Sequence, residues 1–129
     1  MEEQLPTEDT SRIDALRVQI AKRRRHEELR GTEQLGTRWQ AGPEDRLAVL
    51  ESIAFADMVE SQGGQFVTRW KGKGGQWSTG IGRAELMQAA VALGQRRQAC
   101  FARERELLDI LESDPAAFDE QLIGIGWPD

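Results

Sequence analysis

The side chains that most often carry catalysis are scarce in this chain. Among its 129 residues there is one cysteine and one histidine. Cys100 and His26 lie far apart in the sequence, and His26 belongs to a basic run. A nucleophilic cysteine needs a base within hydrogen-bond reach, and a lone cysteine cannot form an internal disulfide. We therefore expect Cys100 to be a small apolar helix residue in a reducing compartment, and we expect no catalytic residues.

Residue spacing also argues against phosphate and metal sites. The segment from Gly72 to Gly75 resembles a phosphate-binding loop, but such a loop places a lysine and a hydroxyl residue at the start of a helix. Here the glycines lead into Gln76 and Trp77, so a hairpin turn is the better interpretation. The chain has no cysteine pair, no second histidine and no aspartate-rich calcium loop. Its acidic residues are spaced as on solvated helix faces, and the sequence predicts no metal and no cofactor.

The charge balance favours a protein partner over nucleic acid. The formal net charge is -5, with 17 lysines and arginines against 22 acidic residues, whereas general DNA binding requires a basic surface. The run from Lys22 to His26 is the strongest basic segment. Consecutive helix residues fan around the axis, so these five cannot form one flat basic face. A small DNA-binding or regulatory protein that uses this run is the alternative from another functional class.

The sequence gives no sign of a membrane span or a signal peptide. No run approaches the ~18 apolar residues that span a bilayer. The acidic start, Met1 to Pro6, lacks the apolar centre of a signal peptide. We therefore expect synthesis in the cytoplasm, and export inside an assembled particle would need no signal on this chain.

The four tryptophans are the strongest candidates for binding. Tryptophan is enriched at interface hot spots and needs a partner for its N–H when buried. For Trp70 and Trp77, which fall in a predicted hairpin, a core role is favoured and a partner surface is the open alternative. For Trp127, near the end of the chain, an interface role is favoured. The candidate partner-binding residues are Trp70, Lys71, Trp77, Ile123, Ile125 and Trp127.

The first third of the chain should hold one helix and a short irregular stretch. A polar lead-in over residues 1–10 precedes a helix capped by Thr10 or Ser11, which ends before Gly31. The helical period is then lost up to Gly42, and Thr37–Trp39 is a candidate for a short strand.

A second helix should begin at Pro43, since proline suits the first helical position, and stop at Gly63. Its expected apolar stripe consists of Leu47, Leu50, Ala54 and Met58, with Ile53 beside it.

A β-hairpin over residues 66–81 and a long helix should follow. Aromatic and β-branched residues alternate on both sides of the glycine turn, with Phe66, Thr68 and Trp70 on one face and Trp77, Thr79 and Ile81 alternating likewise. The helix after Gly82 keeps its period to about Ser113, which gives a length of roughly 45 Å. Part of its stripe should meet the first helix or another chain.

The segment 114–129 is predicted to be a docking tail. After Asp114-Pro115 and a helical turn around Phe118, the chain ends in Ile-Gly-Ile-Gly-Trp-Pro-Asp. On an extended strand, Ile123, Ile125 and Trp127 would share one face and could add to a partner sheet. The open alternative is that the tail folds back onto its own long helix.

The order of these parts is similar to that of a known family. Val67 to Lys71, a glycine turn to Trp77, and a long helix containing Gln98 to Glu104 resemble a domain of unknown function in tail-region proteins of phages and prophages. The resemblance covers about residues 12–112. The family's first hairpin is usually fuller than the stretch from Gly31 to Gly42 here.

The resemblance implies a phage tail-fibre assembly chaperone or fibre-binding protein, without catalytic residues. It implies a tail-fibre or other tail protein as partner, a place in the host bacterial cytoplasm during assembly or in the virion tail, and several copies per trimeric fibre or a homo-oligomer. A structural tail component retained in the virion is the alternative. We expect an α+β, mostly helical fold, with three helices, a central β-hairpin and a second short hairpin, as one domain over residues 11–113.

Overall fold

The structure is a computed structural model that describes residues 7–129, and it has the expected α+β, mostly helical architecture. Its helices are α1 (Thr7–Leu29), α2 (Pro43–Ser61) and α3 (Arg83–Ser113), and two short 3-10 helices, η1 (Pro115–Ala117) and η2 (Glu120–Gly124), follow. The strands are β1 (Thr32–Gln34), β2 (Thr37–Trp39), β3 (Thr68–Lys71) and β4 (Trp77–Ile81). Each consecutive pair forms an antiparallel two-stranded hairpin.

The chain divides into two compact units. The first part of α3 belongs to one unit and its second part belongs to the other. One unit consists of the residues up to Glu27 together with Ala99–Pro128, and the other consists of Glu28–Gln98 with Asp129. We call them the terminal unit and the hairpin unit.

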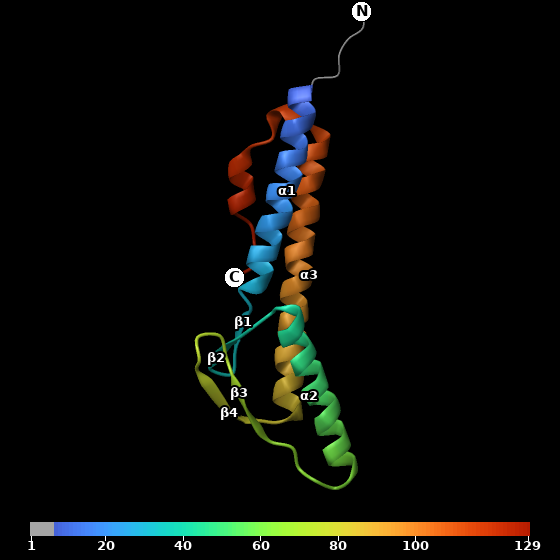
Figure 1. The fold of residues 1–129 in the computed structure, drawn as a ribbon, viewed down its shortest axis with the longest axis vertical. Coiled ribbons are helices and arrows are strands. Elements are labelled where there is room, and N and C mark those ends of the chain that lie inside the picture. Colours follow the sequence, from blue (N-terminus) through green and yellow to red (C-terminus); the bar gives the residue numbers. More distant parts are fainter. Residues whose placement is uncertain (1–6) are drawn as a thin grey trace, which may run out of the picture. The chain divides into compact units, whose positions relative to one another are not determined.

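In the terminal unit, α1 lies beside the second half of α3 and the tail packs against both helices (Figure 1). The buried apolar cluster of this unit draws on all three segments: Leu16, Ile20, Leu107, Leu111, Phe118 and Ile123. The helix begins at Thr7, so the expected cap at Thr10 or Ser11 is wrong.

In the hairpin unit, α2 packs against the first half of α3, and both hairpins contribute to the same core. That core contains Trp39, Ala41, Val49, Ile81, Leu86, Ala89 and Leu93. The strand expected at Thr37–Trp39 is confirmed, and β1 supplies its partner. Leu35 and Gly36, both with positive φ, make the tight turn between them.

The apolar stripe predicted for α2 is exposed, so the side of the helix expected to face the core is wrong. Leu47, Leu50 and Met58 are all more than half exposed, whereas Val49 and Ala56 are buried and Ile53 packs on the core. The helix is apolar on both sides, so spacing alone did not identify the buried one. Packing against α3 selects the side with the smaller residues.

Candidate functional site

Trp70 is held in the hairpin unit by an aromatic stack. Its ring lies on that of Trp39, with centroids 5.0 Å apart and planes at 16°. Trp39 is completely buried, and its Nε1–H donates to the carbonyl of Gln34 at 3.0 Å. Trp70 itself is half-buried against this core. The core role expected for Trp70 is therefore confirmed.

The glycine-rich turn joins the two hairpins through backbone hydrogen bonds. The amide of Gly72 donates to Gln76 at 2.7 Å, and that of Lys73 donates to the carbonyl of Arg38 in β2 at 2.8 Å. A Cβ on Gly72 would lie 1.9 Å from Oγ1 of Thr37. The missing side chain thus permits a close backbone approach, which is a structural reason for glycine here.

Trp77 lies on the opposite, open face of the second hairpin, so the core role favoured for it is wrong. Its side chain is 61% exposed, whereas the next residue, Ser78, is buried and donates to the carbonyl of Leu35 at 2.8 Å. The expected alternation fails because Gly80 has a positive φ and the register shifts between Thr68 and Trp70. This irregularity lets Ser78 and Ile81, three residues apart, both face inward.

The open face of this hairpin combines an aromatic ring with positive charge. Lys71 and Trp77 are direct cross-strand partners and both are exposed. Paired residues project to the same face of a sheet. Arg69 and Lys73 lie in the same hairpin, no acidic residue occurs between Gln62 and Ala84, and the described part of the chain supplies no ion-pair partner to these three cations. We call Arg69, Lys71, Lys73 and Trp77 the hairpin face.

A hollow beside the hairpin face opens onto the edge of Trp70. It has a volume of about 270 Å³ and is lined by Gln40, Asp45, Ala48, Arg69, Trp70 and Lys71. Trp70 and Lys71, two of the residues proposed from the sequence, are thus brought together here, and Trp77 pairs with Lys71 on the neighbouring strand.

The C-terminal candidates do not form the expected extended face. Ile123 lies in η2 and is buried in the core of the terminal unit, and Trp127 packs on the same cluster. The indole of Trp127 donates to the carbonyl of Ile123 at 2.7 Å, whereas Ile125 is 59% exposed. The tail therefore folds back, because two large apolar side chains find a surface between α1 and α3 that an extended strand would leave open.

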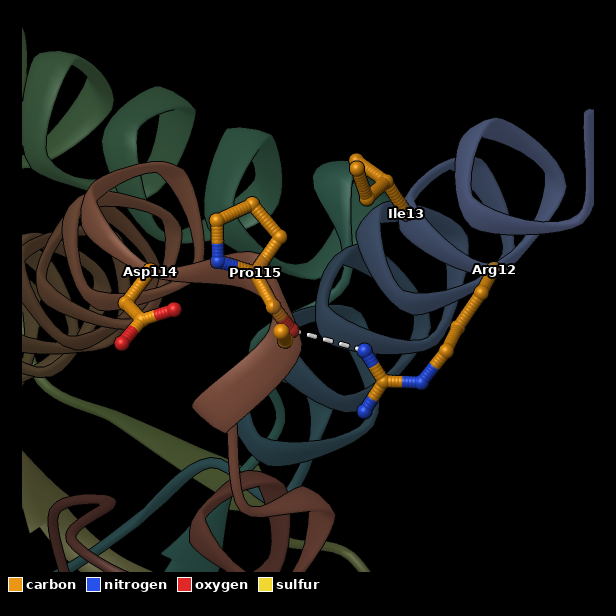
Figure 2. Close-up of a pocket in the computed structure, with 5 residues that line it drawn as sticks. Arg12, Ile13, Asp114 and Pro115 are labelled. Atoms are coloured by element: carbon orange, nitrogen blue, oxygen red, sulfur yellow. Dashed lines mark hydrogen bonds between the residues drawn. The ribbon is translucent and has the colours of Figure 1, made fainter. Parts of the chain in front are cut away.

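A second hollow lies where α1 meets the start of this tail (Figure 2). Its volume is about 270 Å³. The guanidinium of Arg12 donates to the carbonyls of Pro115 at 2.8 Å and Phe118 at 3.3 Å. Arg12 therefore holds the tail after α3 has ended, through one hydrogen bond from each of its two terminal nitrogens.

Two arginines of the basic run of α1 form ion pairs within the terminal unit. Arg23 pairs with Glu27 at 2.8 Å, and Arg24 pairs with Glu104 at 3.3 Å while lying over the ring of Phe101. These partners lie on different segments, as expected for consecutive helix residues that fan around the axis and do not form one flat basic face.

Among residues 7–129, no group of three or more histidine, cysteine, aspartate or glutamate side chains is placed so that it could hold a metal ion. Cys100 is completely buried. The hydrogen bond from Arg105 to Asp109 raises the pKa of this exposed guanidinium, which keeps it cationic.

The described helices include none long and apolar enough to cross a membrane.

An ion-pair cluster that sequence reasoning missed joins three segments of the hairpin unit. Glu28, almost fully buried, accepts from Arg46 of α2 and Arg97 of α3, each at 2.9 Å. These residues are 18 and 69 positions from Glu28, so no local spacing could have indicated the cluster.

The fold and the open residues define a small α+β protein with a basic, aromatic hairpin face. The chain belongs to the family described as "Domain of unknown function (DUF4376)", whose model matches residues 12–122. No curated protein and no solved structure matches the chain.

Proposed function

We propose that this chain is a non-enzymatic binding protein whose partner is another protein, bound at the hairpin face. The observation that carries the proposal is the exposure of Trp77 opposite Lys71 on a hairpin that Trp70 anchors to the core. An exposed tryptophan on a rigid support is typical of an interface hot spot, because little side-chain entropy is lost when it is covered.

The partner that the resemblance favours is a phage or prophage tail-fibre protein. In this proposal the chain is a tail-fibre assembly chaperone or fibre-binding protein, which works in the host bacterial cytoplasm and binds the fibre during assembly. The basic hairpin face favours an acidic surface on the fibre, since complementary charge directs association. A component retained in the virion tail would use the same face.

The test is co-purification of the chain with the tail proteins encoded beside it, followed by titration with the one that binds. Trp77→Ala should weaken binding at least tenfold, because hot-spot truncation costs about 2 kcal/mol or more. Thr79→Ala, an exposed change on the same strand, is the matched control. Cys100→Ala and His26→Ala should leave binding unchanged, and loss of function in either folded variant would contradict the non-enzymatic proposal.

A second candidate function is binding of single-stranded nucleic acid by the same face. Three cations without ion-pair partners in the described residues lie in the same hairpin as an exposed indole, and stacking of bases on aromatics beside cations is the usual mode of such binding. The two functions separate in a salt titration, because phosphate binding weakens steeply as salt rises. Mass spectrometry of purified phage particles distinguishes the two tail roles. A chaperone should be absent from the particles, whereas a virion component should be present in them.

A further inference from the structure

The strongest feature left unexplained is the outward side of α2. Leu47, Leu50, Ala54 and Met58 follow one another at helical spacing on this side, and all four are exposed. The opposite side of the same helix already packs on the core through Val49, Ile53 and Ala56. A helix that is apolar on both sides is typical of an element covered from two directions. We call Leu47, Leu50, Ala54 and Met58 the outer stripe.

The outer stripe borders a groove between α2 and α3 in the hairpin unit. The two helices run antiparallel, since Asp57 near the end of α2 pairs with Arg83 at the start of α3. The groove has a volume of about 180 Å³, and its lining comprises Arg46, Val49, Leu50, Ala90, Leu93 and Gly94. Met87 and Val91 of α3, both exposed, continue the apolar surface beyond Gly94.

Gly94 supports a close approach at this groove. Glycine within a helix lowers helix stability by about 1 kcal/mol relative to alanine. Packing within the hairpin unit does not require a glycine at position 94, because a Cβ there would meet no atom within 4 Å. The space it leaves lies on the groove wall. A backbone that packs against Gly94 could come closer than one that meets a side chain, as at tight helix–helix contacts.

The size of the surface fits a single helix better than a second copy of this chain. Leu47, Leu50, Phe55, Met58, Met87 and Val91 leave between 41% and 58% of their area open. Taking ~150–200 Å² for a fully open side chain of this size, the open area is roughly 500 Å². A stable protein dimer buries about 800 Å² on each partner.

The charge around the stripe disfavours self-association and indicates a basic partner. Five acidic residues and one arginine lie in α2, and the arginine, Arg46, is paired with Glu28. Glu44 and Glu51 are exposed on the flank of the stripe at helical spacing. Pairing of α2 with itself would therefore place like charges opposite one another, which is unfavourable.

We propose that the outer stripe and the adjoining groove dock an amphipathic helix of a partner protein, with apolar residues at helical spacing and lysine or arginine on its flanks. This surface is separate from the hairpin face, and the proposal does not depend on the function proposed there. The mode is that of a helix in a groove, with anchors on Leu47 and Leu50 and close backbone approach at Gly94.

The experiment uses the full chain and two labelled synthetic peptides in fluorescence anisotropy titrations. Both peptides carry leucines at helical spacing, one flanked by lysines and the other by glutamates. We expect the lysine-flanked peptide to bind at least tenfold more tightly. Glu44→Gln and Glu51→Gln should each weaken it about two- to threefold, as expected for exposed ion pairs.

Three substitutions test the location. Leu50→Asp and Leu47→Asp should each abolish binding, and both side chains are exposed enough to tolerate the change. Gly94→Met should also abolish binding while it raises the melting temperature, because it fills the groove and removes a helix glycine. Val18→Asp, at a side chain as exposed as Leu50 but on α1, is the matched control and should bind normally.

Three results would overturn the proposal: equal binding of both peptides, binding that survives Leu50→Asp in a folded protein, or a dimer of the chain in analytical ultracentrifugation that Leu50→Asp converts to a monomer. The last result would identify a second copy as the occupant. Trp77→Ala should leave peptide binding unchanged, so failure of the hairpin face and failure of the outer stripe are distinguishable.

Discussion

The structure predicts that the three tryptophans of the hairpin unit contribute very differently to stability. Trp39 is completely buried, and truncation of a buried tryptophan to alanine costs about 3–5 kcal/mol. That range includes the lost stack on Trp70, for which aromatic pairs contribute about 0.5–1.5 kcal/mol. Trp77 is 61% exposed, so its truncation to alanine should lower the unfolding free energy by no more than about 0.5 kcal/mol.

The assay is urea unfolding followed by far-UV and near-UV circular dichroism, with thermal melting as a second measure. A loss of ~4 kcal/mol from a unit of this size should lower its melting temperature by roughly 15–30 °C. Since total stability is only about 5–15 kcal/mol, Trp39→Ala could unfold the unit outright. Trp39→Phe keeps a ring on Trp70 and is the milder variant, expected to fold with an intermediate loss.

A double-mutant cycle isolates the stack. Combining Trp39→Leu with Trp70→Leu should show a coupling energy of about 0.5–1.5 kcal/mol, whereas Trp39→Leu with Trp77→Leu should be additive. The reasoning is refuted if Trp77→Ala destabilises the protein as much as Trp39→Ala, or if Trp39 couples to Trp77 and not to Trp70.

Three further predictions test the tail, the turn and the ion-pair cluster. Ile123→Ala should lower the unfolding free energy by about 2–5 kcal/mol whereas Ile125→Ala should be neutral; equal melting temperatures would mean that the tail is not folded back. Gly72→Ala should destabilise the hairpin unit more than Gly74→Ala in urea unfolding, because a Cβ at position 72 meets Thr37 while position 74 has only a positive φ to strain; the reverse order would contradict the close contact. Glu28→Gln should lower the unfolding free energy by about 1–3 kcal/mol, because it leaves the two arginines underpaired. The loss should persist in high salt, because the side chain of Glu28 is only 9% exposed. A loss that vanishes in high salt would indicate a solvated ion pair.

Local chemistry in the sequence predicted most of the elements. Pro43 and Gly63 bracket α2, Gly82 precedes α3, and Asp114-Pro115 ends it, all as expected from the conformational limits of glycine and proline. The glycine turn between two aromatic and β-branched runs gave the second hairpin. These signals act within a few residues, so they can be interpreted without knowing what the segment packs against.

The candidate site was predicted only in part, because exposure is not a local property. Trp70, Lys71 and Trp77 do lie together on one hairpin, but which tryptophan faces the core depends on the register shift and on Gly80. The tail residues Ile123 and Trp127 were placed on an extended face, although a short 3-10 helix lets both contact the terminal unit.

The sequence by itself thus determined, to within a few residues, where the three helices and the second hairpin begin and end, and it showed how few of the side chains suited to catalysis the chain carries. Tertiary structure decided which side of each element is covered. In α2 both sides repeat at the helical period, and contact with residues of α3 and of the hairpins buried Val49, while Ala56 on the same side is also buried and Leu47 and Leu50 stayed open. The physical reason is that apolar surface is buried by whatever partner surface fits it, and that surface comes from residues distant in the chain.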